Sequence, residues 1–437
     1  MSVLDVLDGI LRVLQRPVVI IFLSVGVVLT IKTKFLQLRA FPRFWKLLTE
    51  GTKREKDAGN IKTINPIHAL FTAMATTLGM GSIIGPSVAI MSGGPGALFW
   101  MLGFGFFAGI LKFTEVTFAV QTRIKTKDGD VISGPTQYLK FVSSWLASWY
   151  GLIIIFVFAI WSGVQANTLA GIFAMENVPQ WQTGLALAIL VLLVLSGGAK
   201  RVGLFASRLV PVMCFFYVSF AFLILFKDFT ALKAALYSIF VGAFSPAAAA
   251  GGFLGASVFT AMGSGIFKSI FATEAGLGTS SIAHSVADVK NPTDQGILAM
   301  YSVVADVFFS FLSGLLVLVT GIWLSEGATV NTWIYAIFKH RVPTLGAFVL
   351  IISVALFVTT TIIGNSFNGT QSFASITKHK WVSLYLIFTA MVIFFGALIP
   401  VPVVWKLVDV MIILIAVPNV IGIAILAFKK PDVLKIK

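Results

Sequence analysis

Long apolar runs, separated by short polar segments, recur along nearly the whole chain of 437 residues. Most runs approach about 20 residues, the length that an α-helix needs to cross a hydrocarbon core of about 30 Å. The pattern therefore predicts an all-α polytopic membrane protein in one domain, with about eleven transmembrane helices. The expected spans are 17–32, 65–91, 97–122, 150–173, 182–199, 208–226, 257–286, 296–323, 345–374, 381–399 and 405–428.

Both ends of the chain and one internal segment depart from this pattern. Residues 1–16 carry leucines on one helical face, so 1–32 is expected to form an interfacial helix followed by an extra transmembrane helix. Residues 227–256 are apolar but rich in Gly, Ala and Pro, which predicts an extracellular helix and loop, with a re-entrant element at 236–256 as the alternative. The tail 429–437 is expected to be cytoplasmic.

The charge distribution agrees with a membrane location. Only 11% of the residues are charged, the mean hydropathy is +0.96 and the net charge is +15. Lys and Arg gather in alternate short loops, as the positive-inside rule requires, so the excess charge does not call for a nucleic acid. The rule predicts an N-terminus outside and a C-terminus in the cytoplasm, and we expect the protein in the plasma (inner) membrane. The single cysteine, Cys214, excludes an internal disulfide.

Helix-breaking residues interrupt the second span. The stretch LGMGSIIGP at 78–86 has four Gly or Pro among its nine residues. A helix broken at mid-bilayer is tolerated only where its free peptide groups are buried in protein or line a polar cavity. Such breaks hold carboxylates at half-helix N-termini and cations at free carbonyls. The alternative is close helix packing through the small-residue pair Gly81 and Gly85.

A second break of the same kind occurs in the seventh expected span. Residues 273–279 read TEAGLGT, five spans after the first break. This spacing predicts an inverted repeat with one additional helix at the N-terminus. The two five-helix halves would be 63–226 and 257–428.

Several longer stretches resemble the alanine/glycine:cation symporter family over almost the whole length of the chain. They are TKFLQLRAF (33–41), GGPGALFWM (93–101), KRVGLFASRLVPVM (200–213), EAGLGTSSIAH (274–284) and AVPNV (416–420). The resemblance implies the LeuT-type five-plus-five fold within the amino acid-polyamine-organocation superfamily. It also implies transport of a small neutral amino acid such as alanine, D-alanine or glycine, coupled to sodium.

The resemblance also implies an ion site and a substrate site. Adjacent hydroxyls would hold sodium together with main-chain carbonyls; these ligands are Thr360, Thr361, Ala75, Leu78 and Phe357. The alternative for the threonines is a hydrogen bond to their own preceding turn. Substrate contacts are expected at Gly79, Met80, Gly81, Ser82, Gln165, Thr273, Gly276 and Asn365. For Gln165 the alternative is a buried interhelical hydrogen bond.

Four positions depart from the family pattern. Ser82 and Thr273 stand where the family has Asn, Asn365 replaces a Trp, and Thr370 replaces a Glu. Replacing an indole by a carboxamide enlarges the pocket and makes it more polar, so a serine-like substrate becomes plausible.

Charged residues within the spans are costly and are therefore candidates for function. Glu274 and Lys268 flank the second break, and we expect them to pair, with proton coupling through Glu274 as the alternative. Asp306 is a further candidate on the transport pathway. Lys112 and Glu115, three residues apart, are expected to form a local ion pair.

These observations predict a symporter of a small neutral amino acid, driven by a sodium gradient. A proton-coupled transporter or exchanger with altered specificity is the alternative, and a channel or substrate sensor is the alternative from another class. The four histidines form no catalytic or metal-binding pattern, so we expect no enzyme activity. The expected partners are the amino acid, sodium or protons, and the lipid bilayer, without a cofactor, a nucleic acid or an obligate protein partner.

Overall fold

The computed structural model describes residues 3–51, 63–126, 131–244, 258–324, 330, 333–342, 346–378, 380–399 and 401–436, and nearly all of them are helical. The first half contains α1 (Val3–Lys32), α2 (Leu36–Arg39), α3 (Phe41–Glu50), α4 (Pro66–Thr77), α5 (Met80–Gly93), α6 (Ala97–Gln121), β1 (Ile124–Lys125), β2 (Val131–Ile132), α7 (Pro135–Tyr138), α8 (Ser144–Ala174), α9 (Gln180–Leu195) and α10 (Gly198–Phe226). The second half contains α11 (Phe229–Phe244), α12 (Val258–Thr273), α13 (Thr279–Ser285), α14 (Pro292–Thr320), α15 (Trp333–Arg341), α16 (Gly346–Thr377), α17 (Val382–Gly396) and α18 (Val401–Lys429), with short 3₁₀ turns between and after them.

Eight helical segments of the described chain are long and apolar enough to cross a membrane. They are Leu4–Lys32, Pro66–Gly93, Ala97–Gln121, Ser144–Ala174, Gly198–Phe226, Pro292–Thr320, Phe348–Thr377 and Lys406–Lys429. Four shorter apolar helices accompany them: α9, α11, α12 and α17. The architecture is therefore the predicted all-α membrane bundle, while the count of eleven spans stays a prediction.

The N-terminal segment differs from its expected division into two parts. One continuous helix, α1, runs through Pro17 and packs along α18. Its first half is held there by Asp8, whose carboxylate accepts a 2.5 Å hydrogen bond from Lys406, and by the buried side chain of Leu7. These contacts attach the first half to the bundle, and residues 3–16 and the following span form one helix.

The two interrupted helices pack against each other in opposite directions at the centre of the molecule. The first interrupted helix consists of α4 and α5, and the second consists of α12 and α13. Helix α5 contacts α12, and α4 contacts α13. Around this pair lie α6 and α14, which pack extensively on one another, and α16, which packs on α8 and α10. Two chain breaks far apart in the sequence are thereby brought into one core.

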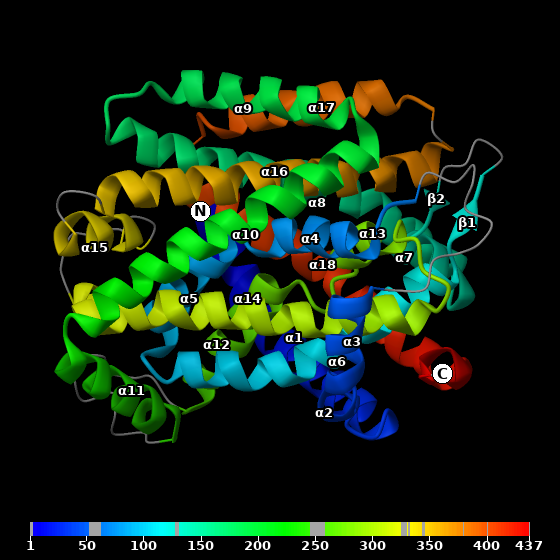
Figure 1. Cartoon of the computed structure of the whole chain (residues 1–437), viewed down its shortest axis with the longest axis horizontal. Coiled ribbons are helices and arrows are strands. Elements are labelled where there is room, and N and C mark those ends of the chain that lie inside the picture. Colours follow the sequence, from blue (N-terminus) through cyan, green and yellow to red (C-terminus); the bar gives the residue numbers. More distant parts are fainter. Residues whose placement is uncertain are drawn as a thin grey trace.

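The short elements gather at the two ends of the bundle. The hairpin β1–β2, the helices α2 and α3 and the C-terminus lie at one end, and α11 and α15 lie at the other (Figure 1). The expected helix in 227–256 is α11, and residues 245–256, including most of the re-entrant alternative, lie outside the described part. Helix α10 begins at Gly198, so Lys200 and Arg201, expected in a loop, belong to its first turns.

Candidate functional site

The first break is narrower than the sequence indicates. Helix α4 ends at Thr77, only Leu78 and Gly79 are non-helical, and α5 begins at Met80 and continues through Pro86. The hydroxyl of Ser82 donates a 2.9 Å hydrogen bond to the carbonyl of Thr77, which satisfies one of the peptide groups that the break releases. The predicted interruption at 78–86 is thus correct in its first two residues and wrong from Met80 onward.

Gly79 is required by a close approach of another helix. A Cβ atom at this position would lie 2.6 Å from the hydroxyl oxygen of Thr361 on α16, well inside van der Waals contact. The same hydroxyl donates a 2.9 Å hydrogen bond to the carbonyl of Ala75, in the last turn of α4. On another side of the break, Gln165 of α8 accepts a hydrogen bond of 3.3 Å from the amide of Met80. The break is therefore enclosed by α8 and α16.

The second break occupies 274–278, between α12 and α13, as predicted. Glu274, Gly276 and Gly278 have φ values of 51°, 80° and 84°, and this left-handed backbone ends the helical hydrogen bonding between α12 and α13. The free peptide groups are held by polar side chains of neighbouring helices. Asn419 donates to the carbonyl of Gly276, Tyr150 donates to that of Leu277, and Glu115 accepts from the amide of Gly278, at 2.8, 2.8 and 2.9 Å.

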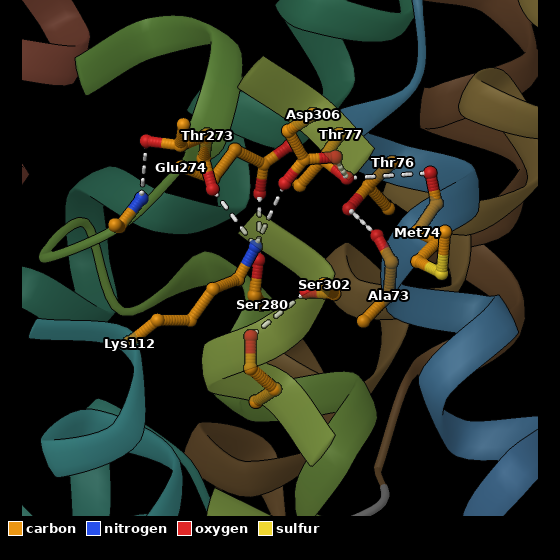
Figure 2. Close-up of polar contacts among 12 residues, drawn as sticks. Ala73, Met74, Thr76, Thr77, Lys112, Thr273, Glu274, Ser280, Ser302 and Asp306 are labelled. Carbon is orange, nitrogen blue, oxygen red and sulfur yellow. Dashed lines mark hydrogen bonds and ion pairs between the residues drawn. The ribbon is translucent and has the colours of Figure 1, made fainter. Parts of the chain in front are cut away.

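A buried ammonium group joins the two breaks. The Nζ atom of Lys112 donates a 2.8 Å hydrogen bond to the carbonyl of Thr273, the last residue of α12, and lies 3.4 Å from a carboxylate oxygen of Asp306. The other oxygen of Asp306 accepts a 2.6 Å bond from Thr77, the last residue of α4 (Figure 2). The first halves of the two interrupted helices, α4 and α12, therefore both end at the ion pair of Lys112 and Asp306.

This arrangement corrects two expected ion pairs. Lys112 pairs with Asp306 and not with Glu115, because its side chain crosses from α6 to α14. Lys268 lies 3.2 Å from Asp409 of α18, so it does not pair with Glu274. The carboxylate of Glu274 accepts hydrogen bonds from two hydroxyls of its own segment, Thr279 and Ser280.

Three carboxyl groups and one ammonium group are completely buried in this region: Asp306, Glu274, Glu115 and Lys112. One oxygen of Glu274 and one of Glu115 have no hydrogen-bond partner in the described part of the chain. Burying an ionised carboxylate is costly without a compensating cation. In the described residues this region thus holds more buried carboxyl groups than cations, and no group of three or more His, Cys, Asp or Glu side chains is arranged to hold a metal ion.

The five expected sodium ligands fall into two contacting groups. Thr361 reaches Ala75, beside Leu78, whereas Thr360 hydrogen-bonds to its own helix at Phe357, 3.0 Å away, and contacts the sulfur of Met213. The alternative considered for the threonines thus describes Thr360, while Thr361 crosses between helices. All five supply oxygen, the ligand that a small hard cation requires.

The carboxamide of Asn365 on α16 is fully buried, and neither of its polar atoms has a partner in the described residues. Asn368, one turn later, and the hydroxyl of Ser366 share this condition. An unpaired buried amide costs about 1–3 kcal/mol, so such a group normally faces water or a ligand. Thr370, by contrast, donates to the carbonyl of Ser366 within its own helix.

A cavity of about 420 Å³ leads toward the first break from one side of the bundle. It lies between α1, α5, α12 and α18, and Gly81 and Gly85 form part of its wall. Two ion pairs border it, Lys268 with Asp409 and Lys406 with Asp8. The cavity thus reaches Gly81, in the first turn of α5.

The model of the family described as "Sodium:alanine symporter family" matches residues 1–435. The chain belongs to this family. It is 30% identical over 420 residues to the protein named "Sodium/alanine symporter AgcS" of Methanococcus maripaludis, covering 93% of this chain and 91% of the relative. It is also 30% identical over 422 residues to "Probable sodium/glutamine symporter GlnT" of Bacillus subtilis, covering 94% and 86% of the two chains.

Among solved structures, the chain is similar to MhsT in complex with L-phenylalanine. The TM-score is 0.63 at 14% sequence identity, and the match covers 85% of this chain and 91% of that one. This similarity confirms the LeuT-type fold. The family and its neighbours are transporters and not enzymes, so the protein is a multi-pass membrane transporter.

The sequence did not predict which side chains hydrogen-bond to the peptide groups of the second break. Tyr150 and Glu115 carry no local signal for this role, because both contact 274–278 across more than 100 positions of sequence. Asn419 differs from these two residues, because it lies in the stretch AVPNV that carries the family resemblance and could therefore have been proposed as a functional residue. Its side chain contacts both Gly276 and Glu115.

Proposed function

We propose that the protein is a secondary active symporter that moves a small neutral amino acid across the membrane with sodium. The observation that carries this proposal is the packing of the two broken helices against each other, with α16 in contact with the first break through Thr361 and Ala75. Membrane transporters built from inverted repeats bind substrate and ion at such paired breaks near the midplane. The expected halves, 63–226 and 257–428, fit this arrangement.

Sodium would be held by the carbonyls of Ala75, Leu78 and Phe357 and the hydroxyls of Thr360 and Thr361. A bound cation would replace the present Thr361 to Ala75 hydrogen bond by ionic contacts of both oxygens. These ligands come from α4, from Leu78 directly after it, and from α16. Sodium binding would therefore fix the position of α4 relative to α16. This is how an ion gradient can drive a conformational change.

The substrate carboxylate would bind at the start of α5. The amides of Gly79, Met80 and Gly81 lie at a half-helix N-terminus, where a negative charge is stabilised. The bond from Met80 to Gln165 is long, at 3.3 Å, so a carboxylate can replace Gln165 as its acceptor.

The rest of the amino acid would face the second break and α16. Ser82, Thr273 and Gly276 would line the pocket, and the unpaired carboxamide of Asn365 would contact a polar part of the substrate. This polar group supports small substrates with a hydrogen-bonding side chain, such as serine, beside alanine and glycine.

Access would alternate between the two sides of the membrane. With the N-terminus outside, the cavity of about 420 Å³ that reaches Gly81 would be the extracellular entrance. Movement of one group of helices against another would close it and open the opposite side.

Uptake by proteoliposomes tests the proposal. Labelled alanine, glycine, serine and glutamine should each be offered with an inward sodium gradient, an inward proton gradient, or neither. We expect accumulation of at least one small neutral amino acid only with the sodium gradient. Absence of uptake for all four would remove the proposed substrate class.

Proton coupling is a second candidate, favoured by the excess of buried carboxyl groups around Lys112. Asp306 and Glu274 would then exchange protons with the two aqueous phases. The same experiment separates the two candidates, because accumulation that follows only the proton gradient would exclude sodium as the driving ion.

A further inference from the structure

A basic cavity of about 410 Å³ lies where the end of α1 meets the end of α18. It belongs to neither of the breaks and lies at the end of the bundle that carries the C-terminus (Figure 1). One wall comes from the turn after α1 and from α2, and the other comes from the short 3₁₀ turn after α18, Pro431–Leu434. Its basic lining residues are Lys32, Lys34, Arg39 and Lys435.

The cavity has more cations than carboxylates to pair with them. None of its lining residues is acidic, and within the described part of the chain only Lys435 has a close carboxylate, that of Asp432 at 2.6 Å. Lys32 lies over the ring of Phe428, 4.1 Å from its centroid. Lys34 and Arg39 are exposed, and neither has an ion pair in the described part of the chain.

The backbone fixes the position of this cluster. Lys34 and Phe35 both have left-handed conformations, with φ values of 55° and 56°. Their amides donate to the carbonyls of Ile31 and Thr30, at 3.0 and 2.9 Å, which closes the end of α1. The turn returns the chain over the helix end and sets Lys34 and Arg39 on one wall.

Apolar side chains beside the cavity are exposed in the manner of a membrane interface. Phe35, Leu38, Phe41 and Trp45 are 50%, 67%, 54% and 60% exposed. Aromatic residues and amphipathic helices such as α3 typically lie at the level of the lipid headgroups. We therefore expect the basic cavity, which the adjoining turn and α2 help to form, to lie at the level of the lipid headgroups.

A second cavity indicates where lipid chains would lie. An apolar groove of about 400 Å³ is lined mainly by α6 and α14, and Gln37 and Leu38 of α2 contribute to its lining. The basic cavity is lined by Leu36 and Arg39 of the same short helix. Helix α2 thus contributes residues to two cavities, the basic one, which suits an anion, and the apolar groove, which suits a hydrocarbon chain.

We propose that the basic cavity binds the phosphate of an anionic phospholipid headgroup from the leaflet next to the C-terminus. Arg and Lys are the side chains that bind phosphate oxygens, and basic pockets at helix ends are suited to anionic headgroups. Free phosphate has the same charge chemistry, but it would gain nothing from the exposed apolar side chains around the cavity. The lipid gains from both, and the site is independent of the transported substrate.

Native mass spectrometry of the purified full chain tests this proposal. The protein in detergent is offered phosphatidylglycerol, phosphatidylcholine or inorganic phosphate, and the bound fraction is measured for each. The variant Lys34→Ser/Arg39→Ser removes two charges from the cavity. The control Lys200→Ser/Lys380→Ser removes two exposed charges elsewhere on the chain.

We expect the wild type and the control to retain phosphatidylglycerol in preference to phosphatidylcholine, and the cavity variant to bind it about tenfold more weakly. Equal binding of both lipids by the wild type, or an equal loss in the two variants, would overturn the proposal. Binding of inorganic phosphate without phosphatidylglycerol would also overturn it, since the lipid source would be wrong. Unchanged melting temperature of the cavity variant checks that it is folded.

Discussion

The hydroxyl of Thr361 lies 2.9 Å from the carbonyl oxygen of Ala75, and this contact joins α16 to the end of α4. It connects a helix of the second expected half to the first break of the first half. Both atoms are oxygen and both residues are buried, so the pair offers two ligands suited to a small hard cation once the hydroxyl turns its hydrogen away from the carbonyl. Among the five proposed sodium ligands, Thr361 and Ala75 are thus joined by a direct contact between two helices.

Replacing Thr361 by alanine should weaken sodium dependence. Removal of one oxygen ligand is expected to raise the sodium concentration for half-maximal uptake by about tenfold, equivalent to about 1.4 kcal/mol. Thr361→Ser keeps the oxygen and should stay close to the wild type. Thr359→Ala, on the same helix and half-buried, is the matched control. An unchanged sodium requirement in Thr361→Ala would exclude this hydroxyl as a ligand.

A methyl group at Gly79 should separate α16 from the first break. The added carbon would lie 2.6 Å from the hydroxyl of Thr361, so one of the helices must shift, and overpacking of this kind costs about 1–3 kcal/mol. We expect Gly79→Ala to lower uptake at least about tenfold while the protein still inserts and purifies. Gly103→Ala, where a Cβ meets no atom within 4 Å, should leave uptake intact. Equal activity of the two variants would contradict the close approach.

Lys112 should be important for stability as well as for transport. Lys112→Met leaves the buried carboxylate of Asp306 without its cation, and breaking a buried pair from one side costs about 3 kcal/mol or more. The free energy of unfolding, measured by denaturant titration in detergent, should fall by this amount. The double variant Lys112→Met/Asp306→Leu should recover more than half of the loss. If it is as unstable as the sum of both single variants, the two groups do not interact.

Asn365 offers a test that separates stability from binding. Since its carboxamide has no partner in the described chain, Asn365→Leu should not destabilise the substrate-free protein and is expected to stabilise it by about 1 kcal/mol. Substrate affinity should fall in the same variant. Asn167→Leu is the contrast, because that carboxamide donates to the carbonyls of Gly396 and Ile399 at 2.9 and 2.6 Å. We expect Asn167→Leu to lower the free energy of unfolding. If it raised that free energy, the hydrogen bonds of the carboxamide would not explain the difference between Asn167 and Asn365.

Local sequence signals located the second break and the start of the first. Glycines at 276 and 278 adopt the left-handed conformations that favour this residue, so the centre and the end of the second break follow from residue type, whereas its start at Glu274 does not. The first break is shorter than expected because Pro86 is accommodated within α5. A proline inside a membrane helix can be tolerated where neighbouring groups compensate for the lost hydrogen bond, and this depends on packing that a single sequence does not show.

Ion-pair partners were less accessible to sequence reasoning. Lys112 and Glu115 are neighbours on one helix, which favoured a local pair, yet Lys112 contacts Asp306, 194 positions away. Lys268 likewise finds Asp409 on α18, 141 positions further on. Such choices follow from which helices are adjacent in the bundle. They become predictable only once the two breaks have been packed against each other.

An experimental density map of the purified protein with sodium and its transported amino acid tests the central claim most directly. The account predicts that the amino acid lies between 79–82 and 273–278, with its carboxylate at the start of α5. It also predicts an ion between Ala75 and Thr361. An amino acid bound away from both breaks, or continuous helices through both segments, would contradict the account.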